Sequence, residues 1–331
     1  MNIFIILITV FIWVESLPAN QLNLQLATES GRNYSEFGQR KFVSRLIGRA
    51  QYQHNFDKTF VRFKTRFAPE FFDYDFQTNT LKFSGNVFVS RNLKNFTWQS
   101  RFFSKNYYYR SPAYNNISFH IFSLGSTVRY PVNQFVEVNW GLDLHLRDTS
   151  TDPHNRLNSI VGEIGTLLNI NQESNAQLDL SVERFHIEER FAPTFSPLNS
   201  GWRYGPTIRL HHKSDYLYTL QYQYIIHSTE LSSEFSDEHN FQMVWGLIFN
   251  KKWSFFLYLN YQFRDETKNE VPLNIAYSPI NNENWYYLQL GYDILKHLEI
   301  YIKAGYMKDD LLYRELAIEE SQFLLGFNIS N

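Results

Sequence analysis

The chain has 331 residues, no cysteine and a formal net charge of −2. The lack of cysteine excludes a disulfide scaffold, a thiolate zinc site and a cysteine nucleophile, and the near-neutral charge gives no electrostatic reason to expect nucleic acid as a partner. Aromatic residues make up 18% of the chain, yet its mean hydropathy is polar, at −0.38. β-Strands in which apolar and polar residues alternate produce that combination.

The N-terminal segment contains an apolar run from Ile3 to Val14, followed by small and turn-forming residues. This run is too short to span a bilayer as a helix, but it has the length of a signal-peptide core. We predict an export signal over residues 1–19, with cleavage after Ser16 or Ala19, although no Lys or Arg precedes the apolar run. The alternatives are an uncleaved anchor and a buried first strand.

The rest of the chain is a series of segments in which apolar and polar residues alternate. In VEVNWGLDLHL, from Val136 to Leu146, Val, Trp and Leu fall on one face and Glu, Asn, Asp and His on the other, because successive side chains of a strand point to opposite faces. Such a segment suits either a half-buried sheet or a tilted strand of a membrane barrel, where about 9–11 residues cross the bilayer. Sixteen segments are predicted, and their first apolar residues are Leu22, Phe42, Val61, Leu81, Phe96, Ile117, Val136, Ile160, Leu178, Trp202, Tyr216, Phe241, Trp253, Tyr286, Leu298 and Phe323.

The links between these segments alternate in length. After every even segment the link is short, as in NFDK and KSD, and after every odd segment it is longer and polar, as in RDTSTDPHNR. Seven short and eight long links predict eight antiparallel hairpins with both termini on the short-link side. We therefore predict that residues 20–331 form one all-β domain, a single 16-stranded antiparallel up-and-down transmembrane barrel, with 14 strands as the nearest alternative. A soluble two-sheet β protein leaves the recurring apolar face unexplained.

This architecture resembles bacterial outer-membrane β-barrels, which have even strand numbers, short periplasmic turns and longer outer loops. The resemblance covers essentially the whole mature chain but indicates no single family. It implies a bacterial outer-membrane location with both termini in the periplasm, contact with outer-membrane lipids and lipopolysaccharide, and insertion by the barrel-assembly machinery. The last segment, Phe323 to Ile329, resembles the tail that this machinery recognises, although the chain ends on Ser330 and Asn331 where such proteins usually end on an aromatic residue.

The polar faces would line the lumen of such a barrel, and their charges fall into two groups. A basic arc is predicted from Arg45, Arg49, Arg62, Lys64, Arg66, Lys82 and Arg101, and an acidic arc from Glu137, Asp143, Glu163, Asp179 and Glu183. Resembling the constriction of porins, the two arcs would set a field across a watery channel. The alternative is that these side chains are solvated lumen positions, paired with neighbours such as Arg203 and Arg209.

These features predict a porin-like passive channel for small hydrophilic solutes. Some inward positions are apolar, among them Phe88, Phe103 and Phe122, so the alternative is a non-conducting structural or assembly barrel of a secretion or surface-polysaccharide system. The tyrosines of KNYYYRSPAYNN, including Tyr107 and Tyr108, are predicted to form an interfacial aromatic belt in preference to a sugar-binding surface.

Catalysis has little support in the sequence, and we predict no enzyme, cofactor or metal site. An outer-membrane lipid hydrolase is the least favoured function. Its nearest candidates are His212 with Ser214 and His227 with Ser228, and neither pair shows an oxyanion arrangement. The neighbouring residues His211 and His212 would diverge in a strand, which argues against a shared metal.

Overall fold

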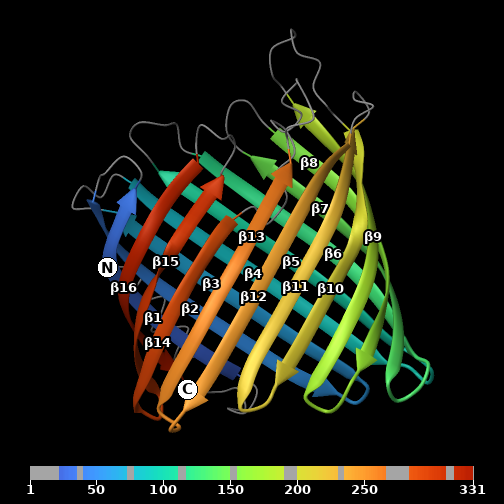
Figure 1. The fold of residues 1–331 in the computed structure, drawn as a ribbon, viewed down its shortest axis with the longest axis horizontal. Helices are drawn as coiled ribbons and strands as arrows, with labels where there is room; N and C mark the ends of the chain where they lie inside the picture. The colour runs from blue at the N-terminus through green and yellow to red at the C-terminus, as the bar shows by residue number, and fades with distance from the viewer. Residues whose placement is uncertain are drawn as a thin grey trace.

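The computed structural model describes residues 22–35, 40–72, 78–110, 117–149, 155–189, 200–229, 235–265, 283–310 and 317–330. The predicted export signal, residues 1–19, lies outside these ranges. Nearly all of the described residues belong to sixteen β-strands (Figure 1). The strands are β1 (Leu22–Ser35), β2 (Arg40–Phe56), β3 (Thr59–Phe72), β4 (Thr78–Asn92), β5 (Thr97–Arg110), β6 (Ile117–Pro131), β7 (Val136–Thr149), β8 (Asn155–Asn169), β9 (Ser174–Glu189), β10 (Ser200–Lys213), β11 (Tyr216–Thr229), β12 (Phe235–Phe249), β13 (Trp253–Asp265), β14 (Glu283–Leu295), β15 (Leu298–Asp310) and β16 (Ala317–Ser330).

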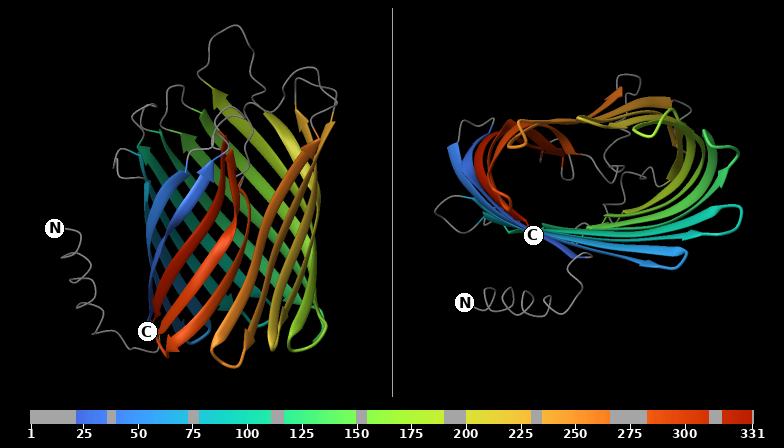
Figure 2. Two further views of the ribbon diagram at one scale, coloured as in Figure 1. Left: turned by 60° about the vertical axis from the view of Figure 1, so that its left-hand side comes forward. Right: turned by 90° about the horizontal axis from the view of Figure 1, so that it is seen from below.

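The sixteen strands form one closed antiparallel barrel in which each strand pairs with its neighbours in sequence and β16 pairs with β1. The closing register places Gln25 opposite Ser330 and Ser35 opposite Glu320. Viewed along the barrel, the strands make a closed oval ring (Figure 2). Closure leaves the sheet without a free edge, as a barrel surrounded by lipid requires. The predicted 16-stranded up-and-down barrel is therefore confirmed. Among the described residues, no helix has the length and apolar character needed to cross a bilayer.

One end of the barrel carries seven short links, as predicted, and β1 begins and β16 ends there (Figure 1). Two of the tight turns use left-handed backbone at Asp57, with φ of 48°, and at Asn250, with φ of 53°. Asp and Asn tolerate this conformation better than most residues. In the β6–β7 link, the Asn133 side chain accepts hydrogen bonds from the backbone N–H groups of Phe135 and Val136, at 2.8 and 3.0 Å. Residues suited to left-handed backbone and a side chain that binds turn N–H groups thus stabilise the tight turns at the short-link end.

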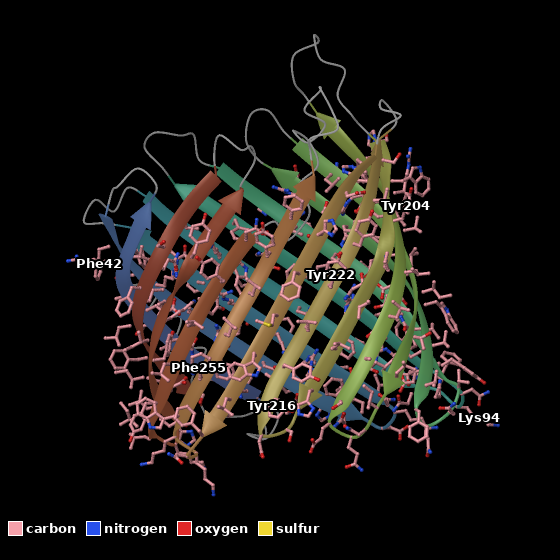
Figure 3. The ribbon with its side chains drawn as sticks, in the orientation of Figure 1. Phe42, Lys94, Tyr204, Tyr216, Tyr222 and Phe255 are labelled. Atoms are coloured by element: carbon pink, nitrogen blue, oxygen red, sulfur yellow. The ribbon has the colours of Figure 1, made fainter. Side chains whose placement is uncertain are left out.

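The strands reverse the usual arrangement of a soluble protein, because their apolar faces point outward. On β7, Trp140 and Leu142 are 48% and 53% exposed, whereas Asn139 and Asp143 on the opposite face are 4% and 5% exposed. The same outward apolar face recurs around the barrel, and Phe42 and Tyr216 in Figure 3 belong to it. A contiguous apolar surface of this kind requires a lipid surrounding.

Strand β6 departs from the predicted faces. The sequence assigned Ile121 to the lipid face and Phe122 to the lumen, but Ile121 is 2% exposed and Phe122, like Leu124, is exposed on the outer surface. The error has a physical reason: the segment SFHIFSL is apolar on both faces, and a shift of one residue exchanges the two faces of a strand. The prediction that Phe122 helps to fill the lumen is therefore wrong.

Candidate functional site: the inner wall of the barrel

A first group of charges on the inner wall, the Arg45 cluster, joins strands β1 to β4 with β15. Arg45 lies between two buried carboxylates, with its Nη1 atom 3.5 Å from Glu29 and its Nε atom 2.9 Å from Glu70. Lys82 is 3.7 Å from Glu70, and Lys303 is 3.6 Å from Glu29. Buried charges are tolerated when they are paired in this way. Two members of the predicted basic arc, Arg45 and Lys82, thus belong to an ion-paired cluster.

The Arg45 cluster also includes a contact that crosses a strand. The Tyr301 hydroxyl on β15 donates a hydrogen bond to Glu29 on β1, at 3.0 Å, although β16 lies between those two strands. The Tyr301 ring passes over Gly326 on β16, where a Cβ atom would overlap the ring. Glycine is therefore required at this position by the close approach of the ring.

A second crossing contact joins the predicted basic and acidic arcs directly. Arg101 on β5 donates from Nε and Nη2 to the two carboxylate oxygens of Asp143 on β7, at 3.2 and 2.8 Å. This bidentate pair spans β6 at Gly125, where a Cβ atom would overlap the Asp143 carboxylate. The two residues were assigned to separate arcs, and the structure brings them together.

A third group, the Arg203 cluster, lies on β9, β10 and β12. Arg203 is 7% exposed and donates from Nη1 to Glu183, at 2.7 Å, and from Nη2 to Glu238, at 2.6 Å. Glu238 is fully buried. Glu183 was predicted as part of the acidic arc, whereas Glu238 was missed because it was placed in a long link that β12 in fact extends into.

The remaining members of the acidic arc lie on β7, β8 and β9. Arg209 on β10 forms ion pairs with Asp179, at 2.5 Å, and with Glu163, at 3.9 Å. Asp179 also accepts a hydrogen bond from the Asn139 amide, at 3.3 Å. Glu137, near the short-link end of β7, has no ion-pair partner within the described part of the chain. Four of the five carboxylates of the predicted acidic arc are therefore ion-paired with arginines, Asp143 with Arg101, Glu163 and Asp179 with Arg209, and Glu183 with Arg203.

Four cations of the predicted basic arc differ from its ion-paired members Arg45, Lys82 and Arg101. Arg49 on β2 and Arg62, Lys64 and Arg66 on β3, which we call the cationic strip, form no ion pair with any carboxylate that the structure describes. Arg49 lies directly opposite Arg66 across the β2–β3 ladder. The strip lines a cavity of about 550 Å³ together with amide and hydroxyl side chains, those of Asn23, Gln25, Gln51, Ser84 and Asn86.

A larger stretch of the inner wall, from β4 to β13, encloses a second cavity of about 490 Å³. Its lining combines the Arg101 and Arg203 ion pairs with a row of amides on β11, β12 and β13. Phe103, which the sequence placed in the lumen, also lines this cavity, as does Val161. The amides are those of Gln221, Gln223, Asn240, Gln242, Asn260 and Gln262.

Aromatic rings cover the part of the inner wall formed by β13 and β14. The Tyr258 and Tyr287 rings lie 4.6 Å apart, and the Lys303 ammonium lies 4.0 Å above the Tyr287 ring. Facing them on β5, Tyr107 is 2% exposed, with the Lys105 ammonium 4.4 Å from its ring. The prediction that Tyr107 belongs to an interfacial belt is therefore wrong, because β5 continues through this segment and turns Tyr107 inward. Tyr108 is exposed on the outer face.

His212, a candidate for catalysis in the sequence, has a hydrogen-bond partner other than Ser214. His212 lies on the outer face, where its Nδ1 atom is 2.8 Å from the Ser174 hydroxyl and its ring stacks on Tyr218. Its partner is thus Ser174 on β9, and not Ser214. His211 points to the other face, where Nδ1 lies 3.0 Å from the Thr219 hydroxyl. In the described ranges, no three His, Cys, Asp or Glu side chains are placed to hold a metal ion.

Comparisons with known proteins support the fold. No protein-family model and no curated protein matches the chain. CdiB from Escherichia coli superposes with a TM-score of 0.55 at 8% identity, over 96% of this chain and 64% of that one. CdiB from Acinetobacter baumannii gives a TM-score of 0.50 at 8% identity, over 94% and 60%. The outer membrane protein OpdK from Pseudomonas aeruginosa gives 0.44 at 10% identity, over 94% and 100%. The chain spans less than two thirds of the length of the CdiB proteins. It has the fold of the outer-membrane β-barrels, with no narrower family indicated.

Proposed function

We propose that this protein is a porin-like passive channel for small hydrophilic solutes in a bacterial outer membrane. The observation that carries the proposal is the contrast between the two surfaces of the barrel. The outer surface is apolar, whereas the inner wall presents charged and amide side chains around cavities of about 490 and 550 Å³. The polar inner wall can contact water and polar solutes, and the apolar outer surface can contact lipid.

In this proposal the short-link end faces the periplasm, as in outer-membrane barrels with short periplasmic turns. Aromatic side chains gather near that end on the outer surface, where Phe249 stacks with Trp253 and Trp253 lies against Tyr292. Such rings are enriched at the level of lipid headgroups. The expected partners are outer-membrane lipids, lipopolysaccharide and the barrel-assembly machinery, together with the solutes that pass through.

The first test is electrical. Full-length mature protein added to planar lipid bilayers should give stepwise increases in conductance, because a hydrophilic lumen provides a path for ions. Heat-denatured protein in the same detergent serves as the control. A folded preparation that never conducts would contradict the channel and would favour the non-conducting assembly barrel, for which the aromatic inner wall and the buried Arg45 cluster are the supporting observations.

The second test concerns ion selectivity. Changing Arg62, Lys64 and Arg66 together to glutamine should shift the reversal potential in a KCl gradient toward cation preference, because three positive charges leave the lumen wall. The matched control changes three exposed cations at the short-link end, Lys58→Gln, Arg91→Gln and Lys94→Gln, which should have a much smaller effect (Lys94 in Figure 3). Equal shifts in both variants would remove the cationic strip from the ion path.

A further inference from the structure

The cationic strip groups four neighbouring inner-wall cations that have no carboxylate partner among the described residues. Elsewhere on this wall six cations form ion pairs, namely Arg45, Lys82, Arg101, Arg203, Arg209 and Lys303. The four strip cations are adjacent on β2 and β3, and their cavity of about 550 Å³ has no acidic residue in its lining. No described carboxylate lies within ion-pair distance of the strip, so a solute anion can bind these cations without displacing a protein carboxylate.

The geometry of the strip is unfavourable without an anion. Arg49 and Arg66 are directly opposed in the ladder, and like charges at such positions repel each other. Arg49 donates a hydrogen bond from Nη1 to the Gln25 side chain, at 2.8 Å. Arg66 lies beside Arg49 and has no carboxylate partner among the described residues. The Nε atom of Arg62 is buried without a hydrogen-bond partner, and its guanidinium lies 5.1 Å from the Phe88 ring. Arginine has five N–H donors, so much of the donor capacity of the strip is unused.

The unused donors suit an oxyanion. Guanidinium groups present paired N–H donors that match the oxygens of phosphate and carboxylate, whereas chloride can use neither their planarity nor their number. From Arg62 to Arg66 the strip extends over about 13 Å, at about 3.3 Å per residue of strand, which allows contact with more than one anionic group. The amides of Asn23, Gln25 and Gln51 can contact the uncharged part of a solute.

We propose that the cationic strip is a binding site for small phosphate-bearing solutes, with Arg49 and Arg66 holding one phosphate group between them. Lys64 and Arg62 attract a second anionic group farther toward the short-link end of β3. The inference deepens the proposed channel function, since it gives the lumen a preferred class of solute, but binding itself does not require conduction.

The test is isothermal titration calorimetry on folded, full-length mature protein in detergent, with pyrophosphate as the probe. Saturable binding is expected, and it should be tighter than binding of inorganic phosphate, while glucose should not bind. Comparing the Kd of glucose 6-phosphate with that of inorganic phosphate shows whether the site prefers a sugar phosphate or free phosphate. Arg49→Gln and Arg66→Gln should each raise the Kd for pyrophosphate about tenfold or more, because a charge-assisted, two-pronged contact is lost. Lys58→Gln, an equal loss of charge at the β2–β3 turn, should leave the Kd unchanged.

Arg66→Lys separates geometry from charge. This variant keeps the positive charge but loses the planar pair of donors, so binding should weaken by several-fold. The site is overturned if pyrophosphate does not saturate, or if the Arg49→Gln and Arg66→Gln variants bind as the wild type does. Thermal unfolding of each variant without ligand shows that it is folded. Binding without bilayer conductance would overturn the channel and leave the site intact, whereas conductance without binding would overturn only the site.

Discussion

Replacing Arg203 with methionine is expected to destabilise the barrel by about 3–5 kcal/mol, the usual cost of removing one partner from a buried ion pair. Arg203 is 7% exposed and is held by Glu183 at 2.7 Å and by Glu238 at 2.6 Å. Without the guanidinium, two carboxylates remain in a site where Glu238 is fully buried and Glu183 nearly so. Urea-induced unfolding in lipid vesicles, followed by tryptophan fluorescence, measures the change.

A matched control for this variant exists on the same inner wall. Arg66→Met removes an arginine that lies opposite Arg49 and has no carboxylate partner among the described residues. In phosphate-free buffer it should change the stability by less than about 0.5 kcal/mol, or raise it slightly, because repulsion between like charges is relieved. A variant with Arg203→Met, Glu183→Gln and Glu238→Gln should recover most of the lost stability. Equal losses for Arg203→Met and Arg66→Met would show that the Arg203 ion pairs contribute nothing specific.

The architecture could be predicted because its signals are local. Two signals specify the sixteen-stranded barrel, and each is visible within a few residues. They are the periodicity of the strands and the alternation of short and long links. The wrong predictions of strand faces and strand ends occurred where the local pattern of apolar and polar residues is ambiguous. In β6 both faces are apolar, and the assignment of Ile121 and Phe122 was therefore inverted. In β5 the polar character of the segment after Lys105 suggested a link, although the strand continues to Arg110.

The partners of the site could not be predicted in the same way, because they depend on register and on distant strands. Every charge of the two arcs was visible in the sequence, but the pairing of Arg101 with Asp143 requires that β5 and β7 align across Gly125. Tyr301 and Glu29 are 272 residues apart and meet only after the barrel closes. Charge type could therefore be predicted, whereas the distinction between ion-paired clusters and the cationic strip required the structure.

A second large effect on stability is expected at Gly326 on β16, where β16 closes the barrel against β1. Gly326→Ala should destabilise the protein by about 3 kcal/mol, as the sum of an overpacked contact and a weakened hydrogen bond to a charged group. The new methyl group would overlap the buried ring of Tyr301, which passes over Gly326 to reach Glu29. Displacement of the ring would also disturb the ion pairs that Glu29 makes with Arg45 and Lys303.

Two comparisons identify the cause of that loss in urea unfolding. Gly85→Ala on β4, where an added Cβ atom meets nothing within 4 Å, should be neutral or slightly stabilising, because alanine restricts the unfolded chain. Tyr301→Leu should be destabilising by itself, but combining it with Gly326→Ala should add little further loss, since the clash depends on the ring. Additive losses from Tyr301→Leu and Gly326→Ala would mean that the glycine is required for a reason other than the passage of Tyr301 from β15 to β1.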